Sequence, residues 1–156
     1  TREVMESAQS TFISSTFWTE RIGPTAALKT LEIMESLESW QQITKNGLYL
    51  RSKWQELADN YGLKINHIGL PSLTTFVFQS ERHMEYKTFI TQEMLKKGYL
   101  AANSCYVSIA HSKKTIDQYI EALDDIFAKI ANFEENPDFA IPLEGPVCHS
   151  GFKRLN

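Results

Sequence analysis

Leu73-Thr74-Thr75-Phe76-Val77-Phe78-Gln79 is the strongest strand prediction in this 156-residue chain. It is rich in β-branched and aromatic residues, which favour the pleated, half-buried surface of a β-sheet. The segment before it, residues 63–68, alternates as a strand does, with Leu63, Ile65 and His67 on one face. Gly69-Leu70-Pro71 lies between them as a turn. The sequence therefore predicts two successive strands joined by a short turn.

Two helices and two short strands are predicted after this pair. A helix over residues 84–97 ends at Gly98 and buries Phe89, Ile90, Met94 and Leu95. Residues 99–101 and 105–110 are predicted as strands. Ser112 can cap a last helix. The apolar residues of that helix recur at helical spacing, at Ile116, Tyr119, Ile120, Leu123, Ile126, Phe127 and Ile130.

Two helices are predicted before the strand pair. Pro24 suits the first turn of the first helix, where its missing N–H costs nothing. The apolar stripe of that helix is Ala27, Leu28, Leu31, Met34 and Leu37. The pattern breaks at residues 36–39 and resumes from Trp40 to Tyr61, ending at Gly62. Gly47 lies inside this second helix, at a cost in propensity of about 1 kcal/mol.

The order of elements is helix-helix, strand-strand-helix, strand-strand-helix, which is an α+β layout. We expect two leading helices, followed by a small, mainly antiparallel sheet with helices on one face. Residues 1–9 look helical, and residues 10–16 have the composition of a short strand. The tail from residue 132 carries three of the five prolines and is expected to be extended or loose.

Composition excludes several classes of function. The net charge of -3 and the lack of a basic tract argue against a nucleic-acid partner. The apolar runs are too short to cross a bilayer, so no membrane partner is expected. The first residues match no signal peptide, which makes a cytoplasmic location the expectation. The chain begins with Thr1 rather than Met, which suggests a fragment or a processed product.

The histidines and cysteines do not predict a site of their own. His67, His83, His111 and His149 are scattered, so no metal site is expected. Cys105 and Cys148 make neither a disulfide framework nor a zinc site. A cysteine nucleophile needs an adjacent base and oxyanion donors. Neither is visible around Cys105, which is therefore interpreted as a buried small residue, and His111 as a packing or hydrogen-bonding residue.

The stretch Phe12-Ile13-Ser14-Ser15-Thr16-Phe17-Trp18-Thr19-Glu20-Arg21-Ile22-Gly23-Pro24 leaves two readings open. Hydroxyl groups and free N–H groups beside a helix start suit an anion such as phosphate. A strand that enters a helix through a polar turn has the same composition. Glu20 and Arg21 could form a solvated ion pair or shape a subunit interface.

Several segments, in order, resemble class III aminotransferases, which are pyridoxal-phosphate enzymes of fold type I. They are FISSTFWTERIGPTAALKTLEIM (12–34), GLYLRSKWQELADNYGLKI (47–65), FITQEMLKKGYLAANSCYVSIAHSKKTIDQYIEALDDIFAKI (89–130) and CHSGFKRLN (148–156). The branch that contains glutamate-1-semialdehyde 2,1-aminomutase is the most similar in pattern. The resemblance covers nearly the whole chain.

The resemblance implies that the chain is the C-terminal third of such an enzyme. Residues 1–60 would be the end of the large domain and the interdomain helices, with a phosphate-contact turn at 14–24. Residues 61–134 would be the small α+β domain, and residues 135–156 an extended tail. The implied activity is amino-group transfer between a small-molecule donor and acceptor in a homodimer. The alternative is a stand-alone α+β module for binding or dimerisation, without catalysis.

The family's site residues carry over only in part. Thr16, with Ser15 as the alternative, matches a threonine that reaches the cofactor phosphate of the neighbouring subunit. The turn here is longer than the family's usual Thr-x-x-x-Asn-Pro. The Schiff-base lysine is expected upstream of Thr1, so the chain holds no catalytic residue and should not hold pyridoxal 5'-phosphate tightly alone. Residues 100–106 contain no arginine for a substrate carboxylate, and Asn103 and Ser104 are expected to line the substrate side.

Overall fold

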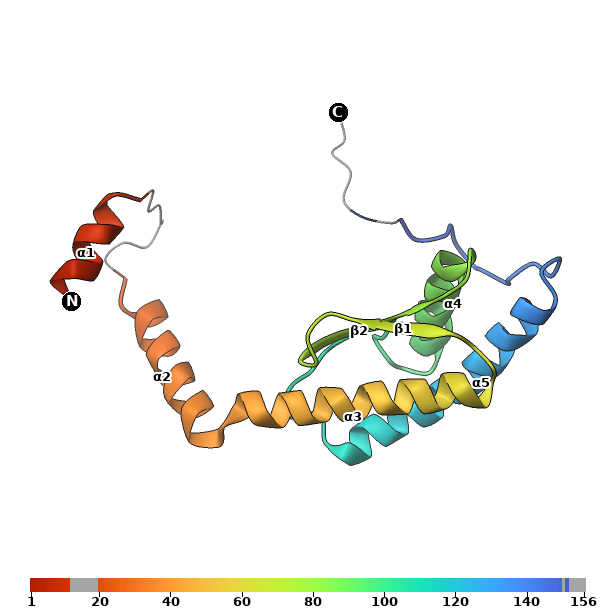
Figure 1. Cartoon of the computed structure of the whole chain (residues 1–156), viewed down its shortest axis with the longest axis horizontal. Helices are drawn as coiled ribbons and strands as arrows, with labels where there is room; N and C mark the ends of the chain where they lie inside the picture. Colours follow the sequence, from red (N-terminus) through yellow and green to blue (C-terminus); the bar gives the residue numbers. More distant parts are fainter. Residues whose placement is uncertain (12–19, 150, 152–156) are drawn as a thin grey trace. The chain divides into compact units, whose positions relative to one another are not determined.

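The computed structural model describes residues 1–11, 20–149 and 151 (Figure 1). The chain forms two compact units, Thr1–Glu38 and Ser39–Asn156, which are described one at a time. The boundary at Glu38 divides compact units of this chain. It does not test the end of a large domain that the resemblance implied near residue 60, which stays a prediction.

The first unit contains two helices, α1 (Arg2–Gln9) and α2 (Ile22–Leu37). The hydroxyl of Thr1 accepts a hydrogen bond from the N–H of Val4 and caps α1. Ser10 and Thr11 were expected to begin a strand over residues 10–16. Their N–H groups and hydroxyls instead donate to the carbonyls of the last turn of α1. The rest of that expected strand lies outside the described residues.

Helix α2 follows the predicted pattern. Pro24 lies in its first turn, and the helix ends at Leu37 because Glu38 adopts the left-handed conformation, with φ of 46°. The predicted break at 36–39 is therefore confirmed. Neither α1 nor α2 has a buried residue among those described. The apolar side chains of α2 that face solvent are Ile22, Leu28, Leu31, Ile33, Met34 and Leu37.

The second unit is built on a three-stranded antiparallel sheet in the order β1-β2-β3 (Figure 1). The strands are β1 (Ile65–Ile68), β2 (Leu73–Phe78) and β3 (Ser104–Tyr106). Ile65 pairs with Phe78, and Thr74 pairs with Cys105. The small antiparallel sheet expected from the sequence is confirmed.

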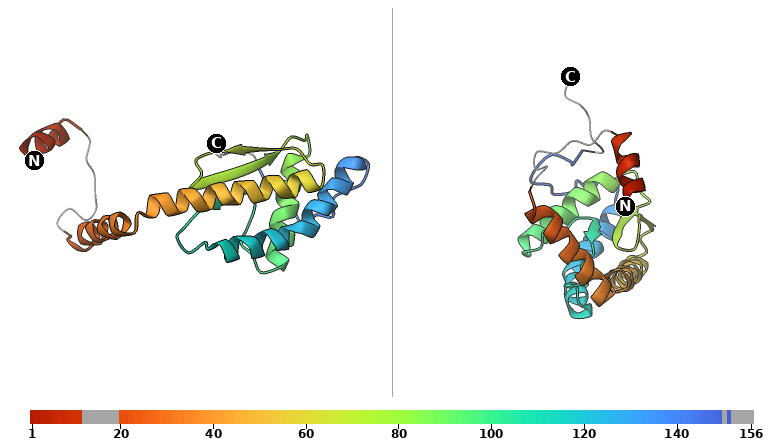
Figure 2. Two further views of the ribbon diagram at one scale, coloured as in Figure 1. Left: turned by 60° about the horizontal axis from the view of Figure 1, so that its bottom comes forward. Right: turned by 90° about the vertical axis from the view of Figure 1, so that its left-hand side faces the viewer.

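Two helices, α3 (Ser39–Asn60) and α4 (His83–Lys96), contact the sheet directly, and α5 (Lys113–Glu135) packs on both helices and places the Phe127 ring against Phe76 and Phe78. Helices α3 and α5 contact one another, as Figure 2 shows from a second direction. The sheet residues that point toward the helices are buried, among them Phe76 and Phe78. The opposite face leaves Ile68, Leu73 and Tyr106 exposed. The aromatic centre of the core is Trp54, Phe76, Phe78, Tyr86, Phe89 and Phe127.

Gly47 lets α3 approach the β1–β2 turn. The residue is buried, and a Cβ built on it would lie 1.8 Å from the carbonyl oxygen of Pro71. Arg51, one turn further along α3, holds the same hairpin. Its Nε donates to the hydroxyl of Thr74 at 2.6 Å, and its second guanidinium nitrogen donates to the carbonyl of Gly69 at 2.6 Å. The glycine that lowers helix propensity is therefore required by the packing of the helix on the turn.

Two predicted strands differ from the structure. Residues 99–101 form no strand, because the N–H of Tyr99 donates to the carbonyl of Met94 and closes α4 after Gly98, whose φ is 84°. The strand predicted over 105–110 is shorter, since β3 ends at Tyr106. A turn follows it, in which the N–H of His111 donates to the carbonyl of Ser108.

The last helix and the tail pack on the same core. Ser112 caps α5 by accepting from the N–H of Thr115, as predicted. The helix continues to Glu135, three residues beyond the expected start of the tail at residue 132. The described part of the tail is extended and lies along α4. There the side-chain oxygen of Gln92 accepts from the N–H of Glu144 at 2.7 Å.

Candidate functional site

The predicted phosphate ligands, Thr16 and Ser15, lie outside the described residues. The structure does describe the end of their turn. The carboxylate of Glu20 accepts from the N–H of Gly23 at 3.0 Å, at the start of α2. The N–H of Gly23, at a helix start where an anion is favoured, is therefore already hydrogen-bonded to the Glu20 carboxylate.

Asn103 and Ser104 lie at the end of β3 and meet β2. The side-chain nitrogen of Asn103 donates to the carbonyl of Phe76 at 2.9 Å, and the N–H of Phe76 donates to the carbonyl of Asn103 at 2.9 Å. The hydroxyl of Ser104 accepts from the hydroxyl of Thr75 at 2.9 Å. The Asn103 amide thus extends the pairing of the two strands, while Ser104 stays on the exposed surface.

Both residues line a cavity of about 240 Å³ between the sheet and the start of α4. His83 and Lys87 border the same cavity from α4. Sequence reasoning did not connect His83 and Lys87 with Asn103 and Ser104, because the two pairs belong to separate elements of the fold. The only signal was the position of His83 and Lys87 at the start of the helix that follows β2. Lys87 and the predicted substrate-lining pair therefore border the same cavity.

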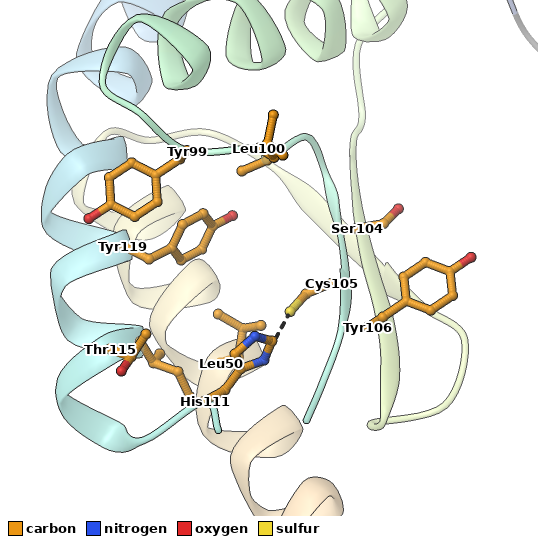
Figure 3. A pocket seen from close by; sticks show the side chains of 11 residues that line it. Leu50, Tyr99, Leu100, Ser104, Cys105, Tyr106, His111, Thr115 and Tyr119 are labelled. Atoms are coloured by element: carbon orange, nitrogen blue, oxygen red, sulfur yellow. Dashed lines mark hydrogen bonds between the residues drawn. The ribbon is translucent and has the colours of Figure 1, made fainter. Parts of the chain in front are cut away.

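A larger cavity of about 390 Å³ lies on the helix side of β3 (Figure 3). It is bounded by α3, the segment 99–101, β3 and the first two turns of α5. Its walls are mostly aromatic and aliphatic, and its polar side chains include Cys105, His111 and Tyr119. Ser104 also borders it.

Cys105 and His111 meet in this larger cavity, which corrects the expectation that no base lies beside the cysteine. The Cys105 sulfur lies 3.9 Å from Nδ1 of His111, and the N–H of Ser108 donates to the same nitrogen at 3.2 Å. Burial raises the pKa of the Cys105 thiol. A thiol that stays protonated is a weak nucleophile, so the pair does not form an activated dyad. His111 follows Cys105 by six positions, across a turn, and this spacing alone did not reveal that the two side chains are close.

His67 is the other histidine with a distinctive environment. It lies on the buried face of β1 and stacks on Trp54, with ring centroids 6.3 Å apart. Both of its ring nitrogens are buried without a hydrogen-bond partner. Burial, and then the positive charge of Arg51, lower the pKa of His67. His67 is partly buried and packs against the core residue Trp54.

The described residues contain neither a cluster of metal ligands nor a helix suited to span a membrane. Within residues 1–11, 20–149 and 151, no three His, Cys, Asp or Glu side chains come together as metal ligands. No helix in that part of the chain is long and apolar enough to cross a membrane.

Relatives of known identity are distant and longer. No family model matches the chain. It is 22% identical over 128 residues to 3-aminobutyryl-CoA aminotransferase of Cloacimonas acidaminovorans, covering 79% of the chain and 31% of that protein. It is 24% identical over 123 residues to glutamate-1-semialdehyde 2,1-aminomutase of Thermodesulfovibrio yellowstonii, covering 70% and 29%. The Methanosphaera stadtmanae aminomutase is also 24% identical, over 117 residues, covering 66% and 27%.

A solved structure shows the fold. The FumI protein of Sphingopyxis sp. MTA144, in its PLP internal aldimine form, superimposes with a TM-score of 0.71 at 18% identity. The match covers 87% of this chain and 33% of that protein. The chain therefore has the fold of the C-terminal part of a fold type I protein, as expected. The resemblance to aminotransferases and aminomutases is confirmed, and the chain spans about a third of the length of these relatives.

Proposed function

We propose that this chain is the C-terminal portion of a pyridoxal-phosphate-dependent aminotransferase or aminomutase. The cofactor, when bound, supplies an electron sink for the movement of an amino group. One observation carries the proposal: the fold matches a third of a PLP protein across 87% of this chain. The named aminotransferase and aminomutase relatives, matched over 117 to 128 residues, support the same conclusion.

The described residues do not form a cofactor site by themselves. No described lysine lines the cavity of about 390 Å³. Lys87 borders only the smaller cavity, among strand and helix residues that offer no phosphate cradle. We propose that the cofactor lysine lies in sequence outside this chain and that the isolated chain is inactive.

The chain would contribute binding groups instead. Thr16, or Ser15 beside it, is proposed to donate its hydroxyl to the cofactor phosphate held by the partner of a homodimer. Asn103 and Ser104 are proposed to line the substrate side, where Ser104 keeps its hydroxyl on the exposed surface. The substrates would be a small-molecule amino donor and acceptor, and the enzyme would work in the cytoplasm.

Thr16→Val in a longer form of the protein tests the phosphate role. The substitution keeps the shape of the side chain and removes the hydroxyl, so the dissociation constant for pyridoxal phosphate should rise about tenfold, as for one lost bond to a charged group. Ser15→Ala is the matched control, with a smaller effect. Unchanged affinity in Thr16→Val with a weakened Ser15→Ala would move the role to Ser15. Unchanged affinity in both would refute the turn assignment.

A stand-alone binding or dimerisation module is the second candidate. It is favoured by one observation, the apolar side chains of α2 that face solvent, such as Leu28 and Leu31. A missing large domain would explain the same exposure. The gene sequence upstream of Thr1 separates the two: a strand followed by a lysine and a glycine-rich turn supports the enzyme, and a start codon at Thr1 supports the module.

A further inference from the structure

We propose that the cavity of about 390 Å³ beside β3 binds a small organic carboxylate with an apolar body. The side chains that form it lie in the second unit, and one of them, Ser104, is also proposed to line the substrate side of the enzyme. Binding there can be measured without the cofactor. Failure of one proposal therefore leaves the other intact.

The walls of the cavity suit an apolar ligand. Leu50 and Ile116 form its floor and are 2% and 4% exposed. Tyr99 and Tyr119 lie next to each other on one side of the cavity in Figure 3, with ring centroids 6.2 Å apart. Leu100 lies at the rim and is 96% exposed. Apolar clefts of this size with a few placed polar groups are typical of small-molecule sites.

Two side chains that line this apolar space, Tyr119 and His111, carry donors without an acceptor among the described residues. The hydroxyl oxygen of Tyr119 accepts from the indole N–H of Trp54 at 3.2 Å, and its own proton has no acceptor among the described residues. Burial raises the pKa of Tyr119, so the hydroxyl stays a donor. In Figure 3 this hydroxyl points toward Leu100, which also lines the cavity.

His111 supplies the second donor. Its Nδ1 accepts from the N–H of Ser108, so the proton of the neutral ring lies on Nε2. Within the described part of the chain, Nε2 has no hydrogen bond. A ligand with an acceptor oxygen would satisfy both donors, whereas a hydrocarbon would leave them unpaired in an apolar site.

The local charge favours an anionic acceptor over a neutral one. Thr115 and Ile116 line the cavity from the first turn of α5, a helix of 23 residues whose N-terminal end carries partial positive charge. Lys113 begins that turn, with Nζ 5.3 Å from the centre of the Tyr49 ring. The nearby carboxylate of Asp117 accepts from the hydroxyl of Tyr49 at 2.5 Å and does not line the cavity.

Titration calorimetry of the full chain with phenylacetate tests the proposal. Phenylacetate carries both an apolar ring and a carboxylate, whereas 2-phenylethanol keeps only the ring and acetate only the charge. We expect phenylacetate to bind at least about ten times more tightly than either, the contribution of a hydrogen bond to a charged acceptor. Equal affinity for 2-phenylethanol, or no binding of phenylacetate, overturns the proposal.

Alkylation of Cys105 tests whether the ligand occupies this cavity. In a Cys148→Ser variant, Cys105 is the remaining thiol, and phenylacetate should slow its alkylation by iodoacetamide with the same concentration dependence as the calorimetric signal. Tyr119→Phe should weaken binding about tenfold. Tyr99→Phe removes the same atom from the same cavity, but that hydroxyl already donates to the carbonyl of Gln118, so affinity should hold.

Protection of Cys105 is measured in a chain that keeps Tyr119, so the test stands even if Tyr119→Phe destabilises the fold. Binding without protection of Cys105 would place the ligand elsewhere and refute the site. A loss of affinity that is equal in Tyr99→Phe and Tyr119→Phe would refute the role of the Tyr119 hydroxyl.

Discussion

Replacing Gly47 by alanine sets helix propensity against packing. Alanine is favoured over glycine inside a helix by about 1 kcal/mol, so propensity alone predicts a more stable protein. The structure predicts the opposite, because the added Cβ would lie 1.8 Å from the Pro71 carbonyl oxygen and 2.5 Å from its carbonyl carbon. The sign of the change in stability decides between them.

The size of the stability change in Gly47→Ala depends on which atoms must move to relieve the contact. The nearest atoms belong to the backbone of the β1–β2 turn, so no side-chain rotation relieves the contact. The turn is also held to α3 by Arg51, which donates to the carbonyls of Ile68 and Gly69. Inserting a methyl into a packed site costs about 1–3 kcal/mol. We expect the free energy of unfolding to fall by up to about 2 kcal/mol after the gain in propensity is subtracted.

Urea denaturation followed by circular dichroism measures this change. Gly145→Ala is the matched control, because a Cβ there meets no atom within 4 Å. That variant should be neutral or stabilised by about 0.4–1 kcal/mol through the unfolded chain. A Gly47→Ala protein that is more stable than the parent by the propensity difference would refute the close approach of α3 to the turn.

Other side chains of the second unit give further predictions. Since the pKa of His67 is lowered in the folded state, the unfolded chain binds the proton first, and stability should fall as pH drops below about 6.5. His67→Leu should flatten that acid limb in urea titrations at several pH values, and an unchanged slope would contradict the assignment. Arg51→Leu leaves the buried Thr74 hydroxyl without its donor and should cost about 1–3 kcal/mol, whereas an effect below 0.5 kcal/mol would argue against the hairpin contact. Ser112→Ala removes the α5 cap and should cost about 1 kcal/mol, with Ser112→Gly losing a few tenths; equal losses would show that the hydroxyl is not the cap.

The sequence predicted the elements that have a strong period or a strong composition. The apolar repeat of α5 and the β-branched, aromatic run of β2 are examples, because each repeat reflects a face that must be buried. Residues 99–101 were assigned wrongly to a strand. Their composition suits a sheet, but the N–H of Tyr99 is taken by the carbonyl of Met94 at the end of α4.

The site was harder to predict than the fold. Asn103 and Ser104 were singled out through a resemblance, and their hydrogen bonds to β2 depend on strand register. Cys105 and His111 come together through a turn, and Tyr119 joins them from the next helix. No spacing rule links residues from three elements, so only the folded chain brings these groups into one cavity.

The apolar side chains of α2 are exposed, and the described residues of the first unit do not cover them. Periodicity placed Leu28 and Leu31 on one apolar face, and both remain exposed in the first unit. A face of this kind is expected where a chain continues into another domain or meets a second copy. It is consistent with a portion of a larger protein.

Titration with pyridoxal phosphate tests whether this chain is a portion of a larger enzyme. The 156-residue chain should be compared with a longer protein that includes the sequence encoded upstream of Thr1. We expect a visible absorbance band, bleached by borohydride, in the longer protein and none in the chain alone. The same band in the isolated chain, or its absence from the longer protein, would refute the proposed function.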